Sequence, residues 1–421
     1  MNSTLLSAQA LSPRVHWIGA LDPAMRSFDI ILKTPNGTTY NAYAVRGSDG
    51  VAIIDTVKEE CAAQFFARLE SVARYDEIKF IVLNHLEPDH SGALPELMRR
   101  APQARLIISE AAQQMLKALL KQSAIPFTPV ASDDTISMGD RTLRFLNTPY
   151  LHWPDTQCTY LEQEAMLFSG DVFGCHFCDE RLFNDSVGDF RFSFEYYYAH
   201  IMRPFKDYVL SALELIEPLA LNVIAPAHGP VLREQPRHYV ERYRELSTPR
   251  LLLDIGRCDK TLIVFYISSY GNTKRMAEVI CEGASAAGGL RVSLYDLEGG
   301  EVEPFVDLVE EADAILIGTP TINGDAVKPV WDLLSSFAKI RVKGKAAGAF
   351  GSYGWSGDAV RTVDERLRGL KMRVPVAGLR IKLIPCADEL EDCYSFGRDF
   401  GNFVLGKPQE RVIDMAELLA G

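Results

Sequence analysis

The sequence predicts an α/β protein of two domains, in which a layered, mixed α/β domain is followed by a doubly wound parallel sheet. The first observation is length, because 421 residues exceed what one hydrophobic core normally organises. The second is the alternation of strand and helix patterns in both halves. The third is a regular succession of five strand–helix units after about residue 262, which requires crossovers of one hand over a parallel sheet.

The N-terminal half begins with strand-like segments at 28–32, 40–45 and 51–55, separated by turn signals such as Asn36-Gly37. A helix is expected over 61–73 and a buried strand over 78–83, followed by helices over 92–100 and 110–122. A further helix is expected at 239–246. This mixed order favours sheets that are covered by helices.

A polar connector after residue 246 separates the halves, and we place the boundary near residue 255. The predicted domains are therefore 1–255 and 256–406, with a short tail at 407–421. In the second domain we expect strands at 262–266, 292–295, 314–317, 346–350 and 379–384. The helices are expected at 273–286, 303–311, 327–338, 358–370 and 395–405.

Composition and charge exclude several classes of function. Hydrophobic residues make up 47% and charged residues 24%, which is ordinary for a globular protein and unlike a disordered one. There is no apolar stretch of the roughly 20 residues that span a bilayer, and no secretory signal is visible, so a cytoplasmic location is expected. A net charge of −12 argues against nucleic acid as a partner. The eight scattered cysteines fit reduced thiols better than a disulfide framework.

The strand predicted at 78–83 leads into a segment with four potential metal ligands: His85, Glu87, Asp89 and His90. We expect Pro88 and Gly92 to keep this segment irregular, so that the side chains converge at the end of a strand. A polar loop with helix-capping side chains is the alternative. Further candidates are His152, Asp171 and His228. Four histidines and three carboxylates suffice for two metal ions, with an aspartate bridge and room for a substrate.

Three loops of the second half have the composition of a flavin site. The first loop is rich in hydroxyl groups and opens a helix, so it offers N–H groups, hydroxyls and the helix dipole to a phosphate. It lacks the glycine pattern of dinucleotide sites and the Walker lysine, so a monophosphate such as FMN fits best, with an ordinary capped turn as the alternative. The candidate FMN-binding residues are Ser268, Ser269, Tyr270, Gly271, Asn272, Thr273, Pro320, Thr321, Ile322, Asn323, Gly324, Ser352, Tyr353, Gly354, Trp355, Ser356 and Gly357.

The metal-ligand string resembles that of the metallo-β-lactamase superfamily, H-x-H-x-D-H followed by His, Asp and His. Glu87 replaces the second histidine, and a carboxylate oxygen at that position favours an iron pair over zinc. With Glu87 the string resembles the flavodiiron proteins, or A-type flavoproteins, over essentially the whole chain, and the three loops resemble flavodoxin from Leu262 to Leu405. The resemblance implies a metallo-β-lactamase-like αββα sandwich followed by a flavodoxin-like domain.

The resemblance also implies the cofactors, FMN and two non-haem irons, and the roles of the ligands. One iron takes His85, Glu87 and His152, the other takes Asp89, His90 and His228, and Asp171 bridges them. His176 is the candidate catalytic residue, expected beside the bound substrate and able to deliver protons there, with a hydrogen-bonded support or a surface residue as the alternative. The implied activity is reduction of dioxygen to water and/or nitric oxide to nitrous oxide, with electrons relayed through FMN from an external donor.

The implied partners are a small electron donor such as rubredoxin or a reductase, and a second subunit in a head-to-tail homodimer or a dimer of dimers. Eleven Lys or Arg against three Asp or Glu between Lys339 and Lys382 suggest a surface that steers an acidic carrier; a solvated helix face is the alternative. The alternative functions are a zinc hydrolase of the metallo-β-lactamase type, and a non-catalytic flavin protein for electron transfer or gas sensing.

Overall fold

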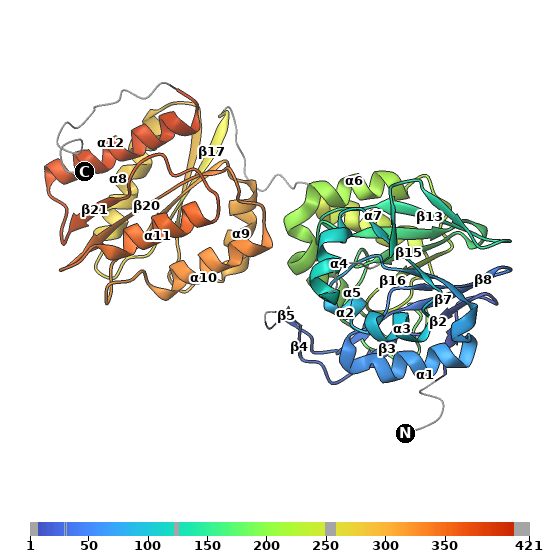
Figure 1. Cartoon of the computed structure of the whole chain (residues 1–421). Coiled ribbons are helices and arrows are strands. Elements are labelled where there is room, and N and C mark those ends of the chain that lie inside the picture. Colours follow the sequence, from blue (N-terminus) through green and yellow to red (C-terminus); the bar gives the residue numbers. More distant parts are fainter. Residues whose placement is uncertain (1–6, 29, 31, 122–125, 249–257, 408–421) are drawn as a thin grey trace. The chain divides into compact units, whose positions relative to one another are not determined.

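The structure is a computed structural model that describes residues 7–28, 30, 32–121, 126–248 and 258–407. The chain divides into two compact units, Met1–Thr248 and Pro249–Gly421, which are described separately; Figure 1 labels their helices and strands. The boundary predicted at residue 255 lies outside the described residues, as does the tail beyond Lys407, so both remain predictions.

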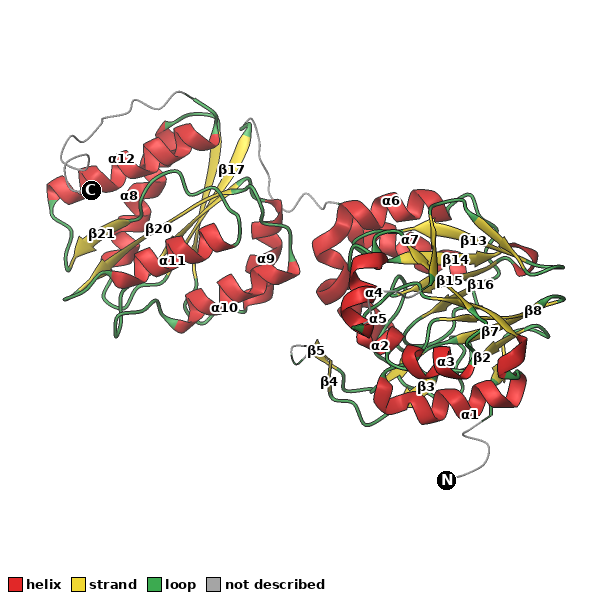
Figure 2. Ribbon diagram, in the orientation of Figure 1, coloured by secondary structure: helices red, strands yellow, loops and turns green. Residues whose placement is uncertain are grey.

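The first unit is a sandwich of two sheets with helices on the outer faces (Figure 2). The first sheet has the order β1-β2-β7-β8-β9-β10-β11, with strands β1 Gln9–Ala10, β2 Val15–Trp17, β7 Tyr43–Gly47, β8 Gly50–Ile54, β9 Ile78–Val82, β10 Arg105–Ser109 and β11 Phe127–Val130. The second sheet has β12 Thr135–Ser137, β13 Thr142–Asn147, β14 Gln157–Leu161, β15 Met166–Gly170 and β16 Val223–Pro226 in sequence order. Two small pairs are β3 Ala20–Asp22 with β6 Thr38–Tyr40, and β4 Ser27–Phe28 with β5 Leu32–Lys33.

Strand β8 shows why the layers stack. Its side chains alternate between the two faces of the sheet. Val51 and Ile53 join the core beneath the helices, whereas Ala52 and Ile54 join the core between the sheets. Both faces of this strand are therefore covered, which explains its continuous apolar sequence.

Helices cover each outer face. On the first sheet these are α1 Ala62–Val72, α3 Leu94–Arg100 and α4 Ala112–Leu120. On the second they are α5 Arg191–Tyr197, α6 Lys206–Ile216 and α7 Pro236–Ser247. Shorter helical turns are η2 Glu59–Cys61, η3 Tyr75–Glu77, α2 Pro88–Ser91, η4 Glu162–Glu164, η5 Tyr198–Met202 and η6 Arg203–Phe205. The αββα sandwich is confirmed.

Two predicted strands are divided in the structure. In the segment predicted at 28–32, Phe28 ends β4 and Leu32 begins β5, which pairs antiparallel with β4, and Ile30 between them has a positive φ of 68°. The segment 40–45 is split between β6 and β7, which belong to different sheets. The reason lies at Asn41, whose backbone N–H donates to the carbonyl of Ala227 at 2.7 Å instead of continuing a ladder.

The second unit is a five-stranded sheet of order β18-β17-β19-β20-β21 in which all neighbouring strands are parallel. Its strands are β17 Lys260–Tyr266, β18 Leu290–Asp296, β19 Ala314–Gly318, β20 Ala346–Tyr353 and β21 Leu379–Lys382. One face packs on α8 Asn272–Ala286 and α12 Ala387–Val404, the other on α9 Val302–Glu311, α10 Lys328–Ser336 and α11 Asp358–Gly369, with η7 Phe337–Lys339 after α10. The doubly wound parallel sheet is confirmed, and its strand order is that of flavodoxins.

Helix α12 begins at Ala387, eight residues before its predicted start. The side chain of Glu389 accepts a hydrogen bond from the backbone N–H of Cys386 at 2.8 Å, which satisfies a free donor at the helix start. None of the helices in the described ranges combines the length and the apolar character needed to cross a bilayer.

Candidate metal centre and flavin loops

The metal-ligand string follows β9 and runs into the short helix α2. His85 and Glu87 precede this turn, and Asp89 and His90 lie within α2. The prediction that Pro88 keeps the segment irregular is therefore wrong, because Pro88 occupies the first position of the turn, where the missing N–H costs nothing. The carbonyl of Glu87 accepts from the N–H groups of His90 and Ser91 at 2.9 and 3.1 Å.

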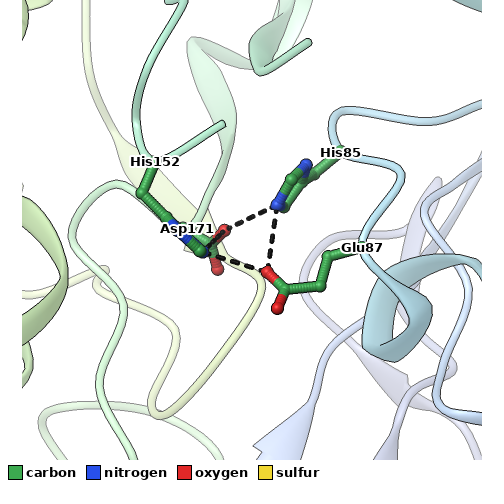
Figure 3. A group of neighbouring side chains, drawn as sticks. All are labelled: His85, Glu87, His152 and Asp171. Carbon is green, nitrogen blue, oxygen red and sulfur yellow. Dashed lines mark hydrogen bonds and ion pairs between the residues drawn. The ribbon is translucent and has the colours of Figure 1, made fainter. Parts of the chain in front are cut away.

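One group of donors consists of His85, Glu87, His152 and Asp171, shown in Figure 3. Glu87 Oε2 lies 3.2 Å from His85 Nε2 and 3.0 Å from His152 Nε2. Asp171 Oδ2 lies 3.8 and 3.9 Å from the same two nitrogens. The four side chains therefore point at one small volume, although they come from three separate parts of the chain.

The second group consists of Asp89, His90 and His228, and Asp171 also reaches it. Asp89 Oδ2 lies 3.1 Å from His228 Nε2. Asp171 Oδ1 lies 3.3 Å from His90 Nε2 and 3.4 Å from His228 Nε2. Asp171 thus turns one carboxylate oxygen to each group, which is the arrangement of a bridging ligand.

These groups fit a pair of metal ions. Ligands held at about 2.1 Å from an ion stand roughly 3 Å or more from one another, which matches the separations here. Asp171 Oδ2, both oxygens of Asp89, and Nε2 of His90 are buried and have no hydrogen-bond partner among the described residues. Buried polar atoms are normally satisfied, so donors left open and aimed at one volume indicate ligation.

The buried charges point the same way. Burial alone would raise the pKa of Asp171, but the neighbouring His90 and His228 lower it well below its usual value. Burial alone would lower the pKa of His228, but the adjacent carboxylates of Asp171 and Asp89 raise it to about 10. Three carboxylates within one buried site require positive charge beside them, which protons on the histidines or metal cations can provide.

Three neighbours of the ligands were not foreseen from the sequence. Asp155 Oδ2 lies 3.0 Å from His85 Nδ1, and the carbonyl of Thr39 lies 2.7 Å from His228 Nδ1. The hydroxyl of Tyr197 donates to Asp171 Oδ1 at 2.9 Å, and burial raises the pKa of this phenol well above its usual value. The only sequence signal was the position of Asp155, three residues after His152.

His176 lies near the second group of donors, 5% exposed. Its ring centroid is 5.4 Å from that of His228, 5.0 Å from that of Tyr197 and 4.5 Å from that of Phe28. Burial, followed by the neighbouring His228, lowers its pKa to about 3, so the ring is uncharged. The structure brings His176 to the site, and its catalytic role stays a prediction.

The candidate flavin residues follow three neighbouring strands, β17, β19 and β20, at their carboxyl ends. Thr273 Oγ1, at the start of α8, lies 2.9 Å from Ser352 Oγ in β20. The backbone N–H of Thr321 donates to the carbonyl of Ser352 at 3.0 Å. The three loops therefore meet at one edge, as the order of parallel strands requires.

This edge fits FMN. Ser268 Oγ and Thr321 Oγ1 are buried without a hydrogen-bond partner among the described residues, and Ser268 precedes the helix start that favours a phosphate. Tyr270 and Trp355 are 92% and 77% exposed, so both rings are available to a planar ligand. Gly351 is needed for close packing of the backbone rather than for the flavin, because a Cβ there would lie 1.9 Å from the carbonyl oxygen of Thr319.

The basic residues between Lys339 and Lys382 do not form one surface. Lys345 donates to the carbonyl of Glu310 at 2.9 Å, and the backbone of Lys371 accepts from Gly344, just before β20. These residues lie at the amino end of β20, opposite the flavin loops. Arg380 and Lys382 of β21 pair beside the flavin end of β20, opposite Gly351 and Tyr353, and Arg361 lies in the first turn of α11, just after the third flavin loop.

Comparisons with known proteins agree with both units. Residues 38–229 match the family model described as ODP family beta lactamase, and residues 264–397 match that of flavodoxin. The chain is 58% identical to the type A flavoprotein fprA of Rhodobacter capsulatus, over 98% of this chain and 95% of that protein. It is 33% identical to a nitric oxide reductase of Moorella thermoacetica, over 92% of this chain and 97% of that protein.

Solved structures show the same architecture. The flavodiiron protein of Giardia intestinalis superposes with a TM-score of 0.64 at 30% identity, covering 95% of this chain and 97% of that one. The rubredoxin oxygen:oxidoreductase of Desulfovibrio gigas gives a TM-score of 0.65 at 27% identity, covering 95% and 99%. The chain therefore belongs to the flavodiiron family of oxidoreductases, the type A flavoproteins, in which a metallo-β-lactamase-like metal domain precedes an FMN-binding flavodoxin-like domain.

Proposed function

We propose that the protein reduces a small uncharged oxidant, dioxygen to water and/or nitric oxide to nitrous oxide, at a diiron site supplied with electrons through FMN. The observation that carries the proposal is the sharing of Asp171 between two converging groups of donors, in a chain with an FMN-binding unit. A relative named as a nitric oxide reductase and a neighbour named as an oxygen oxidoreductase support both substrates.

In this proposal His85, Glu87 and His152 hold one iron, Asp89, His90 and His228 hold the other, and Asp171 bridges them. When bound, the iron pair and FMN supply the electrons that the oxidant takes up. Every proposed ligand except His152 is buried, so bulk water is largely excluded from the donor groups. Glu87 supplies an oxygen donor where a zinc site of this fold has a nitrogen, which favours iron.

The side chains beside the second group of donors suit an uncharged substrate. Phe28 offers an apolar ring and His176 an uncharged one. The hydroxyl of Thr38 donates to the carbonyl of Thr39 at 3.2 Å, so in the 3.0 Å contact between Thr38 Oγ1 and His176 Nδ1 the histidine is the donor. We propose that His176 Nε2 then accepts a hydrogen bond from water or a protonated product.

Two partners follow from the proposal. We infer a head-to-tail homodimer or a dimer of dimers, in which the FMN of one subunit serves the metals of another, as the family resemblance implies. We also infer a separate electron donor of acidic surface, such as rubredoxin, that approaches the flavin edge of β21. Arg380 and Lys382 are exposed there, beside a strand that carries candidate flavin residues.

The test is anaerobic reduction of the iron- and FMN-loaded protein, followed by separate exposure to dioxygen and to nitric oxide. Flavin absorbance and the product are measured together. The proposal predicts rapid flavin reoxidation by at least one gas, and loss of that reaction in Asp171→Asn with FMN still bound. Zinc without iron in the purified protein would support a hydrolase instead. Undiminished turnover in Asp171→Asn would contradict the proposed site.

A further inference from the structure

The two groups of metal ligands are supported by chemically different neighbours. In the first group, His85 Nδ1 lies 3.0 Å from Asp155 Oδ2, a carboxylate oxygen. In the second, His228 Nδ1 lies 2.7 Å from the carbonyl oxygen of Thr39. A ligand histidine that donates to a carboxylate becomes a stronger electron donor than one that donates to a neutral carbonyl, because the anion stabilises positive charge on the ring.

Asp155 is fixed in this role by its surroundings. It is 1% exposed, and the N–H of Leu86 donates to the same Oδ2 at 2.8 Å. The hydroxyl of Ser109, at the end of β10, donates to the backbone carbonyl of Asp155 at 2.6 Å. The other carboxylate oxygen, Oδ1, has no hydrogen-bond partner among the described residues. The partners of this carboxylate therefore lie on the His85 side.

The bridging ligand adds to the difference. Tyr197 donates its hydroxyl hydrogen to Asp171 Oδ1 at 2.9 Å, and this is the oxygen nearer to His90 and His228. Asp171 Oδ2, which faces the first group, accepts no such bond from the described residues. A hydrogen bond withdraws electron density from the oxygen that accepts it, so the bridge donates more weakly to the second position than to the first.

We infer that Asp155 is a positioning residue that makes the position formed by His85, Glu87 and His152 the more electron-rich of the two. Iron held by these residues would favour the ferric state more strongly and would be the first of the pair to be oxidised. The second position stays the more electrophilic one, on the side where His176 and Phe28 lie. The inference rests on the iron binding proposed above and adds an order of oxidation to it.

The test uses Asp155→Asn in the full-length protein loaded with FMN and iron. Asparagine keeps the shape and removes the charge. We expect at least a tenfold loss of the first position's preference for ferric over ferrous iron, which raises its one-electron potential by at least about 59 mV. The potentials are measured by redox titration with electron paramagnetic resonance of the mixed-valence state, and Mössbauer spectra follow the two irons separately. The difference between the one-electron potentials of the two irons should become smaller.

Two further variants make the effect specific. Tyr197→Phe removes the bond to Asp171 Oδ1, so it should narrow the same gap by lowering the potential of the second position. Asp55→Asn is the matched control, because Asp55 is also a buried carboxylate that interacts electrostatically with His90 and His85, but it accepts its hydrogen bond from the backbone N–H of Asn84 at 2.7 Å. An equal rise of the first potential in Asp55→Asn would overturn the inference, since the cause would then be general charge.

A second variant and the wild-type protein test folding and iron binding independently of the Asp155 effect. If Asp155→Asn does not fold, Ser109→Ala replaces it, because losing the 2.6 Å bond to the Asp155 carbonyl loosens this residue and should raise the same potential by a smaller amount. An unchanged difference between the two one-electron potentials in a folded, iron-loaded Asp155→Asn or Ser109→Ala variant would overturn this inference but not the proposed function. A wild-type protein that binds no iron pair would instead overturn the proposed function.

Discussion

Close packing of helices α8 and α12 links stability of the second unit to its flavin loop. Gly397 of α12 faces α8, and a Cβ at this position would lie 2.1 Å from the carbonyl oxygen of Ile280, where ordinary contact begins at 3.4 Å. In Gly397→Ala the helices must therefore separate by more than 1 Å. Overpacking of this kind costs about 1–3 kcal/mol or more, while alanine returns about 1 kcal/mol of helix propensity.

We expect Gly397→Ala to destabilise the second unit by about 2 kcal/mol, a fall of roughly 4–8 °C in its unfolding temperature. FMN should also be held more weakly, because α8 carries the first flavin loop at its amino end. The assay follows thermal unfolding by flavin fluorescence, with iron content as a measure of the first unit, which should not change.

Two alanine variants calibrate the effect. Gly401 tolerates a Cβ better, with its nearest atoms at 3.0 Å, so Gly401→Ala should cost less. Gly369, at the end of α11, has no atom within 4 Å of an added Cβ, so Gly369→Ala should be neutral or stabilising. Equal unfolding temperatures for Gly397→Ala and Gly369→Ala would refute the packing argument.

Three other predictions concern pH, the donor and the dimer. Burial raises the pKa of Asp364 from 3.8 to about 6, so the folded unit prefers the protonated carboxyl and loses stability as pH rises through 6. The amide oxygen of Asp364→Asn can still accept a hydrogen bond from the backbone N–H of Gly378, so this variant should be more stable by about 1–2 kcal/mol near neutral pH. Denaturant titrations at several pH values should show that its stability depends less on pH. Replacing Arg380 and Lys382 by glutamate should slow reduction by rubredoxin several-fold at low salt, whereas the same change at Lys343 and Lys371 should not; equal effects, or no dependence on ionic strength, would contradict docking at β21. Mixed dimers of Asp171→Asn with an FMN-free Ser268→Glu variant should recover oxidant reduction that neither parent shows, and no recovery in mixed dimers would contradict electron transfer between subunits.

Much of the site could be predicted from the sequence because many of its ligand residues lie close together in the chain. His85, Glu87, Asp89 and His90 follow one strand within six positions, and the position of Glu87 separates an iron pattern from a zinc pattern. The flavin loops could be placed together because parallel strands bring their carboxyl ends to one edge. The apolar rhythm of the second half predicted every strand and helix of its sheet, although α12 starts earlier than expected.

Other features depend on contacts between segments that the sequence does not relate. The partners of the ligand histidines, Asp155 for His85 and the Thr39 carbonyl for His228, are separated from them by 70 and 189 positions. Tyr197 stands in a run of three tyrosines, and nothing local distinguishes the one that donates to Asp171. The basic residues between Lys339 and Lys382 likewise form one stretch in the sequence, but the sheet places some at the amino ends and others at the carboxyl ends of its strands.

The sequence by itself determined the two α/β domains, the kind of metal and the kind of flavin, since strand and helix periods, ligand types and loop composition are properties of short segments. Only the tertiary structure decided that Asp155 supports one group of ligands, that Tyr197 donates to the shared Asp171, and that α2 is helical at the ligands. Those outcomes depend on the order and register of strands far apart in the chain, and a local pattern of residues does not specify which partners folding brings together.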